Sequence, residues 1–139
     1  MEGSFETIDH GADIGIVAYG ASIKETFANA ALGLFSLITD LGDVEESLHR
    51  DLAVTAEDLE SLLVGWLNEL IYLFDVEYTL FKRFEVNDLT ETRLRARCYG
   101  ERAEPSRHKL KIGVKAATYH MLRIDKDDNG YKAQVIFDV

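Results

Sequence analysis

Aspartate residues near the start of the chain are the first candidates for chemistry. The segment FETIDHGADIGIVAYG, residues 5–20, places Asp9, His10 and Asp13 between two stretches of alternating apolar residues. A tight turn explains Asp9 and Gly11, because Asp and Gly are favoured in turns between strands. It does not explain Asp13, since Asp is depleted in strands and this one directly precedes an apolar strand. The segment alone leaves a turn, a metal site and an acid/base pair open.

A second unexplained carboxylate lies at the other end of the chain. The final residues are VIFDV, so an apolar strand ends in Asp138 and in the carboxylate of Val139. Hard cations such as Mg²⁺, Ca²⁺ and Mn²⁺ take oxygen ligands, usually a few carboxylates completed by water. Asp13, Asp138 and the terminal carboxylate would form such a set, although charged chain ends also occur without any function. Spacing does not decide between these readings, because the two segments are far apart in the sequence.

Positive charge is concentrated in the segment RHKLKIGVKAATYHM, residues 107–121. We expect a strand over residues 109–118, on which Lys109, Lys111 and Lys115 would share one face. A solvated strand face explains Lys109 and Lys111 without any function. Lys115 stands among small and apolar residues, so we expect a buried or site-facing amine there.

The histidines are weaker candidates for chemistry. His108 and His120 could each respond to pH or bind a metal, but single histidines are more often held by structural contacts, and the role of His10 is left open. The sequence contains no Gly-rich phosphate loop, no H-x-x-x-H pair and no CxxC motif. Cys98 lies in a strand-like segment without activating neighbours. An independent hydrolase or nucleotide-binding enzyme is therefore poorly supported.

Two helices are expected to position these residues. A capping box at residues 22–25 precedes apolar residues at helical spacing, which predicts an amphipathic helix over residues 22–40. Residues 55–58 are expected to open a second helix, with carboxylates in its first turn. Its continuation, residues 59–74, is apolar nearly all round, so we expect it to be the most buried element, anchored by Trp66.

Alternating apolar and polar residues predict strands before, between and after the helices. The stretch KDDNGYK, residues 126–132, predicts a hairpin turn, since Asn129-Gly130 supplies the positive φ values that tight hairpins need. This order of elements indicates one α+β domain over residues 1–139, with two helices packed on an antiparallel or mixed sheet. The expected strands are residues 4–9, 13–20, 47–55, 78–86, 91–99, 109–118, 120–126 and 131–138.

Charge and composition restrict the classes of partner. The chain has 139 residues, a formal net charge of −10 and an isoelectric point near 4.8. A chain this acidic is not expected to bind nucleic acid through a broad basic face, but it could dock on a basic protein. The single cysteine, the lack of an apolar run long enough for a bilayer and the lack of a signal-peptide pattern predict a cytoplasmic protein without membrane contact.

Several of these segments together resemble the archease family, small activators of RtcB-type RNA ligases. The resemblance is carried by DHGADIGIVAYG, SIKETFANAALGLFSLITD, EDLESLLVGWLNELIYLFD, RHKLKIGVKAATYH and the terminal VIFDV. These segments span nearly the whole chain, in the family's order. The sequence departs from the family at Gly11, where Thr is common, so we expect a looser turn before Asp13.

The resemblance implies an assistant to a ligase and not an enzyme. Archease helps RtcB-type ligases to take up GMP from GTP and to turn over repeatedly in joining RNA ends, including tRNA halves after splicing. The resemblance implies a divalent cation (Ca²⁺, Mg²⁺ or Mn²⁺) held by Asp13, Asp138 and Val139, and an activating role for Lys115 at the ligase active site. GTP and RNA would be bound only by the ligase. We expect the strands that carry the two aspartates to lie side by side.

Two further hypotheses stay open. A general chaperone or protein modulator would dock on a nucleic-acid enzyme through its sheet and would need no metal. A stand-alone enzyme would use Lys115 and His120 as acid and base, and turnover by the protein alone would be required to support it.

Overall fold

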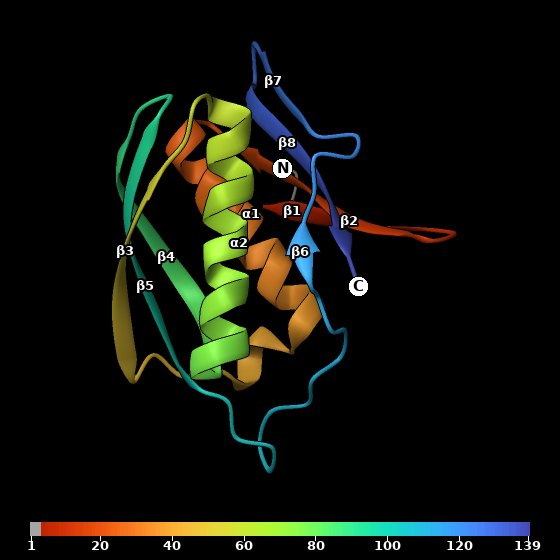
Figure 1. The fold of residues 1–139 in the computed structure, drawn as a ribbon, viewed down its shortest axis with the longest axis vertical. Coiled ribbons are helices and arrows are strands. Elements are labelled where there is room, and N and C mark those ends of the chain that lie inside the picture. Colours follow the sequence, from red (N-terminus) through yellow and green to blue (C-terminus); the bar gives the residue numbers. More distant parts are fainter. Residues whose placement is uncertain (1–3) are drawn as a thin grey trace.

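The computed structural model describes residues 4–139, apart from the side chain of His10. The fold consists of two antiparallel sheets and two helices (Figure 1). The five-stranded sheet has the order β1-β2-β8-β6, with β7 also paired to β8, and the three-stranded sheet has the order β3-β5-β4. The predicted α+β class is confirmed, with two sheets in place of one. The elements are β1 (Phe5–His10), β2 (Asp13–Gly20), α1 (Ile23–Ile38), a 3-10 turn η1 (Leu41–Asp43), β3 (Leu48–Thr55), α2 (Leu59–Glu77), β4 (Thr79–Leu89), β5 (Arg93–Arg102), β6 (Ala116–Ala117), β7 (Arg123–Asp127) and β8 (Gly130–Asp138).

Helix α1 lies between the sheets and packs against β2 on one side and β4 on the other (Figure 1). It begins with the expected capping box. The Ser22 hydroxyl accepts a hydrogen bond from the Glu25 N–H at 3.1 Å, and the Glu25 carboxylate accepts one from the Ala21 N–H at 2.6 Å. Phe27 and Phe35 are fully buried, so this helix contributes large side chains to the core.

Helix α2 begins three residues later than the sequence indicated. Thr55 is the last residue of β3 and therefore cannot open the helix. The Asp58 side chain caps it instead and accepts a hydrogen bond from the Ser61 N–H at 2.8 Å. The first turn of the helix does contain a carboxylate, that of Glu60, in addition to the cap Asp58.

The prediction that this second helix would be the most buried element is wrong. Nine of the 16 residues of α1 are buried, against eight of the 19 residues of α2. Because α2 packs against the three-stranded sheet and β6 with one side only, Tyr72 and Val76 stay 55% and 61% exposed on the other. Trp66 does anchor the packing, since it is fully buried and its indole N–H donates to the Phe27 carbonyl at 3.0 Å.

The expected strand over residues 109–118 forms only near its end, as the short strand β6. Before it, the Lys111 N–H donates to the last carbonyl of α1 at 2.7 Å, and the Lys115 N–H donates to the Asp138 carbonyl at 2.8 Å. These bonds go to two different elements, so no continuous ladder can form along the segment. Lys109, Lys111 and Lys115 therefore do not share a strand face.

The other strands agree with the prediction to within a few residues. β7 and β8 form the expected hairpin, and Gly130 has a φ of 132°. Asn129 does not have the positive φ expected for it; its N–H instead donates to the Asp127 side chain at 2.7 Å. Between β1 and β2, Gly11 has a φ of 61°, a left-handed conformation that glycine adopts without strain. The predicted turn is confirmed at Gly11, whereas Asp9 lies in β1, paired with Ile14, and is not part of the turn.

Gly15 allows β2 and β8 to approach each other. It is paired with Ile136, and a Cβ at this position would lie 2.3 Å from the Val135 carbonyl oxygen and 2.9 Å from the Ile136 Cδ1 atom. Both atoms belong to β8, and the first is backbone, so the strands would have to separate. The close spacing of this central pair of strands thus depends on a glycine at position 15, which has no Cβ.

A buried carboxylate fastens the segment between β5 and β6. Glu101 is only 7% exposed; it pairs with Arg107 and with His108, and it accepts a hydrogen bond from the Glu45 N–H at 2.8 Å. Burial acts to raise the pKa of the Glu101 carboxyl, but these hydrogen bonds outweigh it and the pKa is lowered from its usual value. The carboxylate therefore stabilises the fold in its charged form.

Replacing Gly15 tests the close approach of β2 and β8. We expect Gly15→Ala to lower the free energy of unfolding by roughly 1–3 kcal/mol, the range for an overpacked interior. Gly113→Ala is the matched control, because a Cβ at Gly113 meets no atom within 4 Å. Urea unfolding of both variants measures the difference, and equal stabilities would show that Gly15 does not set the strand spacing.

The pH dependence of stability tests the charged state of Glu101. Because folding lowers the pKa of this group, its contribution is complete above the ordinary value of about 4.3 and is lost as the pH falls through the lowered value. We expect Glu101→Gln to lower the free energy of unfolding at pH 7 by about 1–3 kcal/mol, because the amide NH₂ would face one of the donors that now bind the carboxylate. The variant should also lose less stability in acid than the wild type, because it has no carboxylate to protonate. Thermal unfolding between pH 3 and 7, with the exposed Glu91→Gln as control, measures both effects; an unchanged acid profile would contradict the assignment.

Candidate functional site

The antiparallel pairing of β2 with β8 brings the two unexplained aspartates to the same end of the five-stranded sheet. Ile14 is paired with Phe137, so Asp13 at the start of β2 and Asp138 at the end of β8 occupy the next positions of the two strands. Both residues line one open pocket, which Val139 borders at the end of the chain. The strands that carry the two aspartates therefore lie side by side, as expected.

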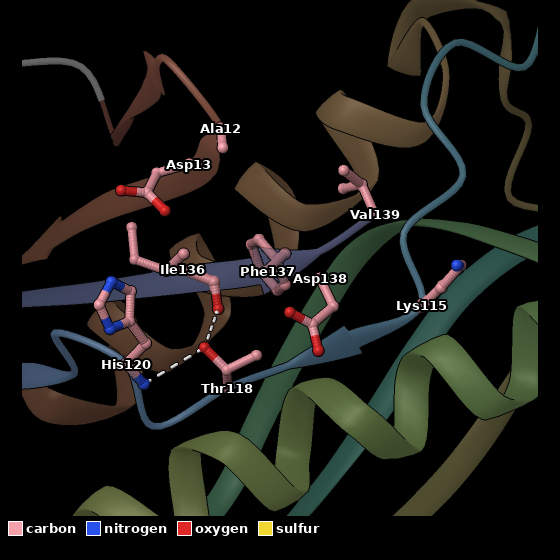
Figure 2. A pocket seen from close by; sticks show the side chains of 9 residues that line it. All are labelled: Ala12, Asp13, Lys115, Thr118, His120, Ile136, Phe137, Asp138 and Val139. Atoms are coloured by element: carbon pink, nitrogen blue, oxygen red, sulfur yellow. Dashed lines mark hydrogen bonds between the residues drawn. The ribbon is translucent and has the colours of Figure 1, made fainter.

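The opposite wall of this pocket comes from the segment around β6. Ala116 of β6 is paired with Asp138. The Thr118 hydroxyl donates to the Ile136 carbonyl at 2.8 Å and accepts a weaker bond from the His120 N–H at 3.3 Å (Figure 2). Lys115, Thr118 and His120 thus line the pocket together with the aspartates. Residues that are far apart in the sequence meet here because β8 has β2 on one side and β6 on the other.

Helix α2 holds the free edge of β6. The Asn68 side chain accepts a hydrogen bond from the Ala117 N–H at 2.8 Å and donates one to the Ala117 carbonyl at 3.4 Å. An amide side chain here replaces the neighbouring strand that β6 lacks on this side. Asn68 was not among the residues singled out from the sequence, although a polar residue inside an apolar helix was a usable signal. Thr118 had no such signal.

The two aspartates have no partner among the residues that the structure describes. Elsewhere carboxylates pair with arginine, as in the ion pair between Asp51 and Arg97 at 2.7 Å. No described side chain forms a hydrogen bond or an ion pair with the carboxylate of Asp13 or Asp138. Asp13 is half-buried and Asp138 is exposed. Two uncompensated negative charges thus face one pocket.

Lys115 does not neutralise this charge. Within the described part of the chain its amine has no hydrogen bond or ion pair, and Figure 2 shows it directed away from both aspartates. The side chain is exposed, so the alternative of a buried amine is wrong, and the residue borders the pocket. The amine is therefore available to a partner molecule.

The histidines fall into three different situations. His120 is exposed and lines the pocket on the side of Asp13 (Figure 2). His108 is buried in the cluster around Glu101, away from the pocket, where its ring nitrogens have protein partners. The His10 side chain lies outside the described part of the structure, so its role stays a prediction.

The pocket offers oxygen donors. Among the described residues there is no group of three or more His, Cys, Asp and Glu side chains close enough to hold a metal ion. Asp13 and Asp138 supply two side-chain carboxylates, and the main chain of Val139 supplies further oxygen atoms. Hard cations accept such a set when water completes the coordination shell, whereas Zn²⁺ prefers nitrogen and sulfur. The donor chemistry therefore fits Ca²⁺, Mg²⁺ or Mn²⁺.

Comparison with known proteins identifies the family. The model of the archease protein family matches residues 5–139. The chain belongs to the archease family. It is 42% identical to the archease of Methanosarcina acetivorans, with 97% of this chain and 95% of the relative covered, and 42% identical to the archease of Pyrococcus abyssi, with 97% and 98% covered. The predicted resemblance is confirmed.

Solved archease structures share the fold. The solution structure of Methanobacterium thermoautotrophicum protein 1598 matches with a TM-score of 0.85 and 40% identity, over 98% of this chain and 99% of that one. The crystal structure of an archease from Thermotoga maritima, described as a possible chaperone, matches with a TM-score of 0.67 and 21% identity, over 96% of each chain. The second likeness concerns the fold alone. None of the helices in the described part of this chain is long and apolar enough to cross a membrane.

Proposed function

We propose that this protein activates an RtcB-type RNA ligase in tRNA splicing and RNA repair. It would promote the GTP-dependent guanylylation of the ligase and its repeated turnover, without catalysing a reaction itself. Membership in the archease family over residues 5–139 carries the proposal. The ligase would bind GTP and RNA, since a chain with a net charge of −10 is a poor ligand for nucleic acid.

A divalent cation held by Asp13, Asp138 and main-chain oxygen of Val139 is part of this proposal. The unpaired carboxylates on one pocket support it, because a cation would compensate their charge. A cation bound there would supply positive charge for phosphate oxygens at the ligase active site. Asp13 is held by its pairing with His10 of β1 and Asp138 by its pairing with Ala116 of β6, so both aspartates lie on paired strands.

Lys115 is the proposed contact with the ligase active site. Its exposed amine stands on the rim of the pocket and has no partner within the described chain. The overall negative charge would favour association with a basic RNA-binding enzyme. The ligase would then meet an amine and a cation on the same face of its activator.

Cation binding is measurable without the ligase. We expect CaCl₂, MgCl₂ or MnCl₂ to raise the melting temperature of the wild type, because a ligand that binds only the folded state stabilises it. Asp13→Asn and Asp138→Asn should lose this rise, while Asp128→Asn, an exposed residue of the β7–β8 turn, should keep it. Isothermal titration calorimetry gives the stoichiometry, and equal binding by all four proteins would exclude this site.

Ligase guanylylation tests the function itself. A cognate RtcB-type ligase with GTP and a divalent cation is assayed alone, with the wild type and with variants. We expect strong stimulation by the wild type, a loss of tenfold or more in Asp13→Ala and Asp138→Ala, and a loss of roughly tenfold in Lys115→Ala, the scale of one charged interaction. Lys132→Ala is the control for a lost exposed lysine.

The outcomes separate the hypotheses. If both aspartate variants still stimulate the ligase, the bound metal has no role in activation. That result would favour a protein modulator or chaperone that only docks on the ligase. No stimulation of an authentic ligase would reject the proposal. Turnover of GTP or RNA by this protein alone would favour the stand-alone enzyme.

A further inference from the structure

The segment that delivers Lys115 to the pocket has little regular structure of its own. Between β5 and β6 the chain forms only an isolated bridge from Leu110 to Thr39 and a few turns. Surface loops of this kind are normally mobile unless other groups hold them. The position of Lys115 therefore depends on contacts made earlier in the segment.

Buried polar side chains supply these contacts. In the described part of the chain the buried polar or charged residues are Thr26, Thr39, Thr79, Glu101 and His108. Thr39, Glu101 and His108 all contact this segment or its start. Such groups are costly to bury unless every bond is made, so their concentration along one loop indicates that its path is specified.

His108 connects three parts of the chain. Its Nδ1 atom accepts a hydrogen bond from the Glu104 N–H at 2.8 Å, so this nitrogen carries no proton. The proton of the neutral ring is then on Nε2, which lies 2.9 Å from the Glu101 carboxylate and 3.1 Å from the Asp43 carbonyl. The ring, which is 3% exposed, joins the loop to the end of β5 and to the turn η1 after α1.

Further hydrogen bonds hold the segment between His108 and the pocket. The Thr39 hydroxyl donates to the Lys109 carbonyl at 2.8 Å, and the Lys111 N–H donates to the Ile38 carbonyl at 2.7 Å. Val114 is buried, and the Lys115 N–H donates to the Asp138 carbonyl at 2.8 Å. Contacts with fixed elements thus follow one another along the path from His108 to Lys115.

We propose that His108 and Glu101 are positioning residues that clamp this segment and thereby hold Lys115 beside the aspartate pocket. The inference rests on the proposed function for the role of Lys115, but the clamp itself is a property of the isolated protein. Without the His108 ring, the Glu104 N–H and the Glu101 carboxylate each lose a partner. Among the described residues, the loop then keeps only the exposed Arg107 side chain as a hydrogen-bonding contact with η1, through the Asp43 carbonyl at 3.4 Å, so the path of the chain towards Lys115 is less firmly held.

Amide hydrogen exchange tests the clamp directly. At a temperature well below unfolding, His108→Gln should increase the exchange rates of the Lys111 and Lys115 amides by about tenfold or more, while amides of the β3–β5 pairing keep their protection. His49→Gln is the matched control, because His49 is exposed on β3. Thr39→Val, which removes only the hydroxyl bound to Lys109, should give a smaller change in the same direction and replaces His108→Gln if that variant does not fold.

Ligase stimulation then tests the positioning role. We expect His108→Gln to lower the maximal stimulation of guanylylation by about tenfold, with an unchanged half-saturating concentration and unchanged cation binding. A merely destabilised protein would instead raise the half-saturating concentration, because less of it would be folded. Unchanged amide exchange in the folded variants would overturn the clamp. Faster exchange with full stimulation would overturn the positioning of Lys115, and failure of the wild type to stimulate would reject the proposed function while amide exchange still decides the clamp.

Discussion

The antiparallel pairing of β2 with β8 is the contact on which the rest of the structure depends. The two strands come from opposite ends of the sequence, and their register places Asp13 and Asp138 at the same end of the sheet. Gly15 keeps the strands close enough for this register, since a side chain would meet the backbone of β8. Because β8 also pairs with β6 and β7, it contacts three of the other four strands of this sheet.

Charge is distributed unevenly over the protein. On the three-stranded sheet, arginines and carboxylates largely neutralise one another, as Arg97 does with Asp51 and Arg93 with Asp88. At the pocket the opposite holds, because Asp13, Asp138 and Lys115 have no hydrogen-bonding or ion-pair partners among the described residues. Groups that a structure leaves uncompensated at one place are the natural contacts for a ligand or a partner protein.

In the loop between β5 and β6, buried polar contacts hold the chain in place, as backbone hydrogen bonds between strands do elsewhere. The sheets hold Asp13 and Asp138 through backbone pairing, so these residues need no special support. Lys115 lies at the end of a segment without a continuous ladder, and the cluster of Glu101 and His108 compensates for this. The two halves of the pocket are thus held by different kinds of interaction.

The sequence by itself determined the class of fold, most of the strands and the identity of the unusual aspartates. Apolar periodicity and capping residues act over a few neighbouring positions, so they predicted α1, the β7–β8 hairpin and the turn at Gly11. Only the tertiary structure decided that residues 109–115 would not form a strand, that α1 and not α2 would be the more buried helix, and that Asn68 would support β6. Each of these depends on which element lies alongside, and the local pattern of side chains does not contain that information. For the same reason Asp13 and Asp138 could be picked out as anomalies from the sequence, but only the pairing of their strands put them on one pocket.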